Sequence, residues 1–169
     1  MKTTVKLYAW DYSHARTYLL AVLFVVGNVL FPQLCHLVPG GGLTWLPIYF
    51  FTLIAAYKYG IFVGVLTALF SPLVNHFLFA MPAAAVLPAL LAKSCLLAIA
   101  AAVAARYAKR ISLGAVVLAV LGYQVLGCAV EWGLTGSFMT AVQDFRIGVP
   151  GILLQIFGGY ALLRVMAKW

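Results

Sequence analysis

Charged residues are almost absent from four long stretches of this chain. No Lys, Arg, Asp or Glu occurs in residues 17–57, 59–92, 111–130 or 147–163. A helix needs about 20 apolar residues to cross the core of a bilayer, so these stretches indicate membrane-spanning helices. Open sheet edges cannot face lipid, and the pattern therefore predicts an all-α membrane protein.

We expect six transmembrane helices in a single integral membrane domain, residues 1–169. The predicted spans are residues 17–37, 45–57, 60–79, 83–105, 112–132 and 150–166. The second is short, and Lys58 is the only charge between it and the third. Pro150 suits the first turn of the last helix. No long linker or clear internal repeat divides the chain, so we expect one six-helix bundle.

The basic residues gather on one side of the predicted bundle, and an even number of spans places both termini on that side. Nine of the eleven Lys and Arg residues lie there: Lys2, Lys6, Arg16, Lys58, Arg106, Lys109, Arg110, Arg164 and Lys168. The positive-inside rule makes this the cytoplasmic face of the inner cell membrane. Loops 39–44, 80–82 and 133–149 then face outward, and Lys93 and Arg146 depart from the pattern.

Composition excludes a soluble domain. The chain is 66% hydrophobic and 8% charged, with a mean hydropathy of +1.09, whereas soluble domains carry about 25% charged residues. The net charge of +8 is divided among positions next to the membrane, where it meets the lipid bilayer, so no nucleic-acid partner is expected. No cleavage site follows the first apolar run, which we expect to be retained.

Polar residues inside the spans predict a pocket. They are Asn28, Gln33, Asn75, His76, Lys93, Gln124, Glu131 and Gln155, and most fall in the outward half of the membrane. Polar groups are costly in lipid, so they should face the bundle interior and pair with each other or with a bound molecule. We therefore expect a pocket open to the outside.

Lys93 is the strongest single signal, because it lies deep in a span and far from the cytoplasmic cluster at Arg106. Burying a lysine there costs about 2.5–3.5 kcal/mol, so something should compensate it. One interpretation is a counter-charge for an anionic group on a ligand. The others are an internal pair with Glu131 and snorkelling to the outer surface, and the sequence leaves them open.

Several further residues are candidates for the same pocket. Gln124, Cys128 and Glu131 share a helix face, because they are spaced by four and three residues. Trp45, Tyr49 and Trp132 could contact a ligand or belong to an interfacial aromatic belt. The substrate-binding candidates are Lys93, Asn75, His76, Glu131, Trp132, Trp45, Tyr49, Gln124 and Asn28.

Motifs for catalysis or metal binding are weak. Cys35 and His36 are adjacent, and two donors do not make a coordination shell. Ser71 with His76 could pair a nucleophile with a base, a combination too common to predict an intramembrane hydrolase. We therefore expect a binding protein rather than an enzyme, with no catalytic residues, metal or cofactor.

Two segments resemble the substrate-binding S component of energy-coupling factor (ECF) transporters. They read PGGGLTWLPIYFFTLIAAYKYG at residues 39–60 and GVLTALFSPLVNH at residues 64–76. The resemblance extends over about residues 43–105 and implies an ECF S-component-like six-helix fold. It further implies capture of a vitamin or related micronutrient in an outward-facing pocket. The implied partners are a membrane scaffold subunit and two cytoplasmic ATPases, and release is thought to follow toppling in the membrane.

The chain departs from that family in two places. The family often presents Ala-x-x-x-Ala on the first helix for docking, whereas Ala21 is followed here by Val25, with Gly27 nearby. Nickel and cobalt members share an amino-terminal Met-His, and this chain begins Met-Lys, so those metals are not expected.

A ligand with an aromatic or heterocyclic body and an anionic arm would suit Trp45, Tyr49 and Trp132 beside Lys93. The alternative function is that of a structural membrane protein resembling the rod-shape determinant MreD, which shares a six-helix outline and needs no ligand.

Overall fold

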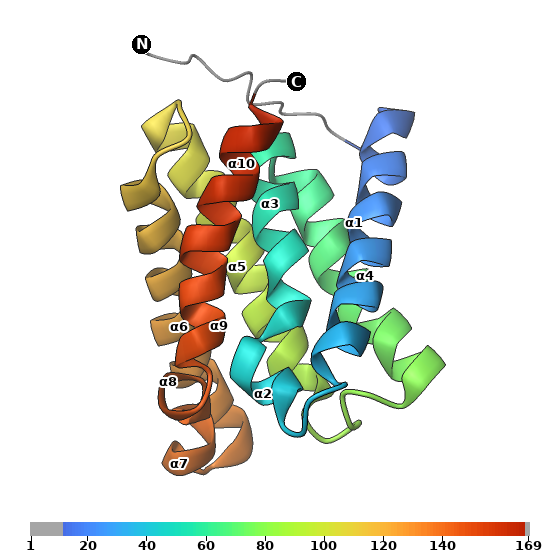
Figure 1. The fold of residues 1–169 in the computed structure, drawn as a ribbon, viewed down its shortest axis with the longest axis vertical. Coiled ribbons are helices and arrows are strands. Elements are labelled where there is room, and N and C mark those ends of the chain that lie inside the picture. The colour runs from blue at the N-terminus through green and yellow to red at the C-terminus, as the bar shows by residue number, and fades with distance from the viewer. Residues whose placement is uncertain (1–11, 168–169) are drawn as a thin grey trace.

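The computed structural model describes residues 12–167, which fold into helices joined by short connections (Figure 1). The elements are α1 (Ala15–Cys35), α2 (Gly41–Trp45), the 3-10 helix η1 (Pro47–Tyr49), α3 (Phe50–Tyr59), α4 (Ile61–Phe79), α5 (Leu87–Ala108), α6 (Leu113–Thr135), α7 (Phe138–Ala141), α8 (Gln143–Arg146), α9 (Val149–Leu153), the π-helix η2 (Leu154–Gly158) and α10 (Gly159–Met166). The predictions for Lys2, Lys6 and Lys168 lie outside the described residues. No strand occurs between residues 12 and 167, which confirms the all-α fold class.

Within the described residues, five helical segments are long and apolar enough to cross a membrane. They are Ala15–Cys35, Ile61–Phe79, Leu87–Ala108, Leu113–Thr135 and Val149–Met166. These match the first, third, fourth, fifth and sixth predicted spans to within a few residues. The chain is thus a helical protein of multi-pass membrane character.

The second predicted span, residues 45–57, folds as the end of α2 followed by η1 and α3. Leu46 separates them, because its φ of 46° is left-handed and interrupts the helix. The remaining helix α3 has 10 residues, about 15 Å of rise, which is short for a bilayer core. Hydropathy alone cannot distinguish such a buried helix from a full span, and the count of six spans stays a prediction.

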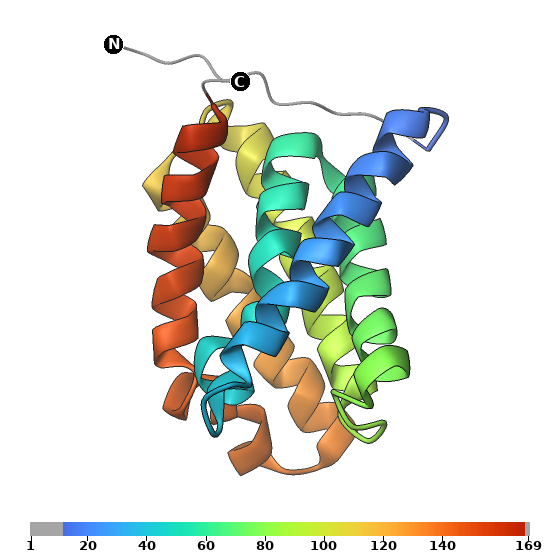
Figure 2. The same ribbon diagram turned by 45° about the vertical axis from the view of Figure 1, so that its right-hand side comes forward.

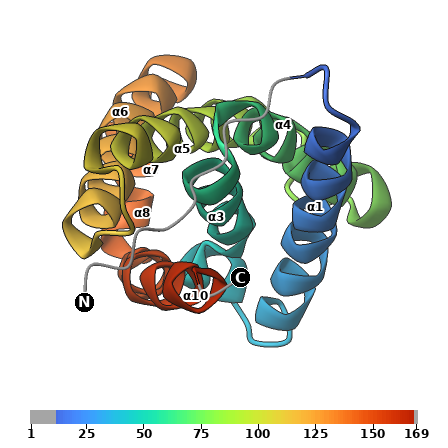
Figure 3. The same cartoon turned by 90° about the horizontal axis from the view of Figure 1, so that it is seen from above.

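Helix α3 fills the centre of the bundle. Seen from above, it lies within the ring of α1, α4, α5, α6 and α10 (Figure 3), and it contacts α1, α4, α5 and α10. Leu53, Ile54 and Ala55 have no exposed surface. Gly64 of α4 lets α3 and α4 approach each other closely, since a Cβ at residue 64 would lie 2.8 Å from Ala56 Cα of α3. The small residues Gly64 and the fully buried Ala68 thus serve helix packing, whereas Gly60, with a φ of 93°, forms the turn between α3 and α4.

The start of the first long helix and the end of the last one lie at the same end of the bundle (Figure 1). Helix α1 begins and α10 ends there, whereas α2, α7, α8 and the connection between α4 and α5 lie at the opposite end, here called the pocket end (Figures 1 and 2). At the end where α1 begins, the basic residues of the described chain are Arg16, Lys58, Arg106, Lys109, Arg110 and Arg164. Which end faces the cytoplasm stays a prediction.

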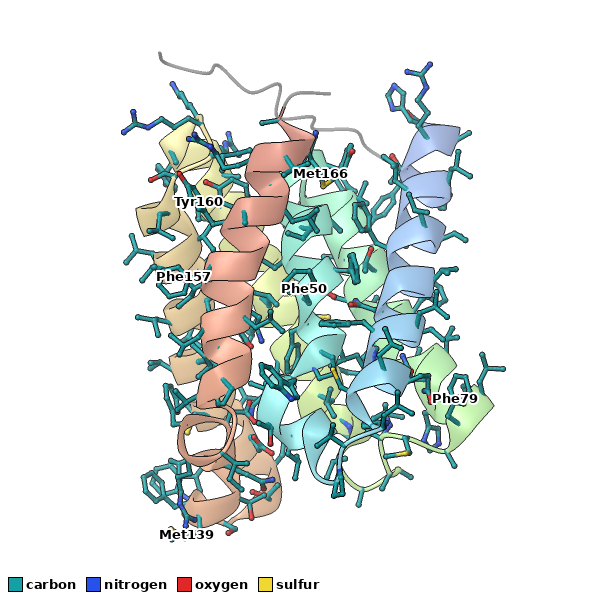
Figure 4. All side chains as sticks on the ribbon, in the orientation of Figure 1. Phe50, Phe79, Met139, Phe157, Tyr160 and Met166 are labelled. Atoms are coloured by element: carbon teal, nitrogen blue, oxygen red, sulfur yellow. The ribbon has the colours of Figure 1, made fainter. Side chains whose placement is uncertain are left out.

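Apolar side chains cover the outside of the bundle, as expected of helices in lipid. Leu19 and Leu23 of α1 and Leu118 and Val125 of α6 are all more than half exposed. Figure 4 shows such side chains projecting outward along the helices, Phe157 among them. In contrast, Ala21 is only 5% exposed and packs inward, so it is not available on the outer face of α1.

Candidate functional site

A cavity of about 300 Å³ opens at the pocket end of the bundle, a volume at the lower limit of small-molecule sites. Its walls come from the end of α1, from α2 and η1, from the connection before α5, and from the first turns of α5. Asn75 of α4, the end of α6 and the helices α7 and α8 complete it. Segments far apart in sequence therefore meet around one space.

An ion cluster lies on the cavity wall. Lys93 Nζ donates a hydrogen bond of 2.9 Å to Asp144 Oδ2 and forms a second ion pair with Glu131 Oε2. All three side chains are largely buried: Lys93 is 4% exposed, Asp144 12% and Glu131 13%. Buried charges are costly unless they are paired, and the two carboxylates supply that pairing for Lys93.

Three elements position this cluster. Lys93 lies in the second turn of α5, Glu131 near the end of α6, and Asp144 on the short helix α8. Helix α6 leaves room for the lysine at Gly127, where an added Cβ would lie 2.7 Å from Lys93 Cγ. The absence of a side chain at that position lets Lys93 run along α6 to its partners.

Of the interpretations of Lys93 that the sequence left open, the internal pair with Glu131 is the arrangement present. Asp144 was not among the candidates, because it lies in a loop where a solvated carboxylate is ordinary. A signal was nevertheless available. The chain has only three acidic residues, Asp11, Glu131 and Asp144, and only the last two fall on the same predicted side as Lys93.

The structure brings together four of the nine candidate residues. Lys93, Asn75, Glu131 and Tyr49 line the cavity. The other five, Asn28, His76, Gln124, Trp45 and Trp132, do not line it.

The two tryptophans lie at the surface. Trp45 and Trp132 are 40% and 52% exposed, and the Trp132 ring packs against Phe138 at 5.4 Å between centroids. Their exposure is typical of interfacial aromatic residues. Of the three aromatic residues expected beside a ligand, only Tyr49 lines the cavity, and its buried ring packs on Tyr123 at 5.5 Å between centroids.

Asn28 belongs to a network that ties three helices together. Its amide nitrogen donates to Thr52 Oγ1 and Ser71 Oγ, each at 3.0 Å, and its side-chain oxygen accepts from the backbone of Phe51 at 3.1 Å. Asn75 Nδ2 in turn donates to the backbone oxygen of Asn28 at 2.9 Å. With its side chain engaged within α1, α3 and α4, Asn28 has a structural role.

His76 and Ser71 are engaged with different partners. His76 Nδ1 is 2.7 Å from the backbone oxygen of Pro82, which holds the connection that forms part of the cavity wall. Ser71 is fully buried and accepts from Asn28. Each side chain therefore has a structural contact of its own.

Several buried polar side-chain atoms of the described chain lack a hydrogen-bond partner, among them atoms of His36 and Gln124. His36 lines the cavity, and its Nδ1 is buried without a hydrogen-bond partner. Gln124 is buried deeper in α6, with both side-chain polar atoms unsatisfied. As a lining residue, His36 joins the candidate site, whereas the sequence analysis considered it only as a weak metal donor beside Cys35.

The arrangement is suited to binding a small molecule. Most of the wall is apolar, and the polar groups are few and concentrated at the ion cluster, Asn75 and His36. Among residues 12–167, no group of three or more His, Cys, Asp and Glu residues is placed to hold a metal ion. No family model, no curated protein and no solved structure matches this chain.

Proposed function

We propose that this chain is the substrate-capture subunit of an ECF-type importer, resident in the inner cell membrane. It binds a vitamin or related micronutrient in the cavity at the pocket end, which faces outward. It makes no covalent bond with the ligand and hydrolyses no nucleotide. Transport energy comes from partner subunits, a membrane scaffold and two cytoplasmic ATPases.

The cavity is the observation that carries this proposal. Its volume of about 300 Å³ accommodates a compact organic molecule, and a purely structural helical bundle has no need of such a space. The segment at residues 39–60, which resembles S components, supplies the wall formed by Gly42, Leu46 and Tyr49, and the segment at residues 64–76 supplies Asn75. The resemblance and the cavity thus coincide.

The position of the cavity also supports capture from outside. It lies at the end opposite Arg16, Lys58, Arg106, Lys109, Arg110 and Arg164, which the positive-inside rule places in the cytoplasm. Because the residues that line the cavity lie at the pocket end, release on the other side needs a large rearrangement. Toppling of the whole bundle in the membrane, driven by the partner subunits, provides one.

The test is mass spectrometry of small molecules released from the gently purified protein in detergent. Ala89, which is 6% exposed and lines the cavity, is replaced by Phe to fill the space. Leu126→Phe, on the outer face of α6 where the side chain is 56% exposed, is the matched control. We expect a stoichiometric compound in the wild type and in L126F that is absent from A89F.

An empty wild-type protein that retains stable protein partners would contradict the proposal. It would instead favour the structural alternative resembling MreD. A compound that binds equally to A89F would place the ligand outside the cavity and would also count against the proposal.

A further inference from the structure

We infer that the ligand of this cavity carries a protonated nitrogen, as an amine or a cationic nitrogen heterocycle, which the carboxylates of Glu131 and Asp144 bind. The inference rests on the proposed function and deepens it by giving the chemical class of the substrate. It reverses the anionic arm expected from Lys93 alone.

The charge balance of the cavity wall is the first argument. Lys93 contributes +1, and Glu131 and Asp144 contribute −1 each, so the cluster carries 1 − 2 = −1. Lys93 is the only Lys or Arg among the described residues that line the cavity. Arg146, the other basic residue at this end, is exposed and lies off the cavity wall.

This imbalance matters because the charges are largely removed from water. All three side chains are at most 13% exposed, so little solvent screens the second carboxylate. A bound cation would neutralise the cluster, whereas an anionic group would face two carboxylates through a lysine that is already paired. Electrostatics therefore selects a positive ligand group over a negative one.

Hydrogen-bond capacity is the second argument. Lys93 contacts one oxygen of each carboxylate, Glu131 Oε2 and Asp144 Oδ2, so the second oxygen of each side chain is not paired with this ammonium group. An ionised carboxylate is an acceptor only, with about four lone-pair sites. The unused acceptors call for N–H donors, and an ammonium or a protonated ring nitrogen supplies donors and charge together.

The rest of the wall indicates the body of the ligand. Leu46, Ile48, Val86 and Leu90 present apolar surface, and the buried ring of Tyr49 offers an aromatic contact. Apolar walls cannot replace the hydration shell of a small inorganic ion, so they favour a compact organic cation. His36 also lines this wall.

The test uses three probes with one body and different charge: benzylamine, benzyl alcohol and benzoate. Binding to the purified full-length protein in detergent is measured as the shift of its thermal unfolding midpoint with probe concentration. We expect benzylamine to bind tightest in the wild type. Asp144→Asn should weaken benzylamine about 10- to 100-fold, the range for a hydrogen bond to a charged group.

Charge reversal gives the sharper variant. Glu131→Gln with Asp144→Asn leaves Lys93 as the only charge of the cluster, so benzoate should now bind more tightly than benzylamine. Unfolding midpoints without probe report whether each variant is folded. Trp132→Phe, next to Glu131 in sequence but off the cavity wall, should keep the wild-type order of the probes.

The outcomes separate this inference from the proposed function. Tighter binding of benzoate or benzyl alcohol by the wild type would overturn the inference and leave substrate capture standing. If no probe binds, the charge of the compound released from the wild type tests the inference. A cationic compound supports it, and a neutral or anionic compound overturns it. If no probe binds and no compound is released, both fail.

Discussion

Asp144 Oδ2 accepts a hydrogen bond of 2.9 Å from Lys93 Nζ, although 51 residues separate the two. The bond ties α8 to the second turn of α5. In sequence, α8 lies between the long apolar segments Leu113–Thr135 and Val149–Met166. Glu131 on α6 meets the same ammonium group. One lysine therefore holds three elements together at the mouth of the cavity, and its surroundings are the most informative place to perturb.

Replacing Lys93 by Met should destabilise the protein, because it leaves two neighbouring carboxylates without their cation. Breaking a buried ion pair in this way costs about 3–5 kcal/mol. The triple variant K93M/E131Q/D144N removes all three charges and should regain most of that stability. Thermal unfolding in detergent checks both. A K93M protein that melts at the wild-type midpoint would show that the cluster contributes no stability.

Gly127→Ala should disturb Lys93 without touching its charge. The new Cβ would lie 2.7 Å from Lys93 Cγ, near the start of that side chain, so the lysine must shift. We expect a loss of about 1–3 kcal/mol in unfolding free energy. Gly122→Ala on the same helix meets nothing within 4 Å and should be neutral or stabilising by about 0.5–1 kcal/mol. Equal effects at the two glycines would contradict the arrangement.

Gly64→Ala should separate α3 from α4. A Cβ there would lie 2.5 Å from Ala56 Cβ and 2.8 Å from Ala56 Cα, and backbone cannot move aside as a flexible side chain can. The expected loss is at least about 1–3 kcal/mol, measured as a lower unfolding midpoint and a smaller monodisperse fraction. Gly114→Ala, whose nearest neighbour is Ser112 Oγ at 3.8 Å, is the matched control. A G64A protein as stable as G114A would exclude the close approach.

Asn28→Ala removes three side-chain hydrogen bonds and leaves the backbone N–H of Phe51 without its acceptor. We expect a loss of about 2–3 kcal/mol, since each bond in a membrane bundle contributes about 0.6–1 kcal/mol. Thr52→Val keeps the shape of its site and removes a single partner, so it should cost less than half as much. Comparable losses in the two variants, by thermal unfolding, would contradict the central role of Asn28.

The orientation of the bundle is open to direct measurement by cysteine labelling. In a background in which Cys35, Cys95 and Cys128 are replaced by Ser, Met139→Cys places a thiol on α7 at the pocket end, and Lys109→Cys places one after α5. A membrane-impermeant maleimide added to whole cells should label the first and spare the second until the membrane is opened. The reverse pattern would invert the topology and place the cavity in the cytoplasm.

Much of the fold could be predicted from the sequence because lipid imposes simple rules. Five of the six predicted spans correspond to long apolar helices, since length and hydropathy alone mark a helix that must satisfy its backbone within itself. The second span was predicted less well. Leu46 takes a left-handed conformation and α3 is buried among its neighbours, and both features depend on packing rather than on hydropathy.

The candidate site divides in the same way. Lys93 could be identified from the chain alone because a lysine deep in an apolar run must be compensated, and Glu131 followed as a possible partner. Asp144 could not, because only the folding of α7 and α8 back over the bundle brings it within 2.9 Å of Lys93. Trp45 and Trp132 do not line the cavity, and the sequence could not show this because the direction of each side chain depends on helix rotation.

The sequence by itself determined that this chain forms apolar helices, that most of its basic residues flank these helices, and that one lysine lies deep within a helix. The physical reason is that transferring charge into lipid is so costly that it shows directly in composition. Only the tertiary structure decided that the lysine is outnumbered by two carboxylates on a cavity wall. Which charges meet depends on contacts between distant segments. The sign of the net charge on the cavity wall then sets which charge the bound ligand carries.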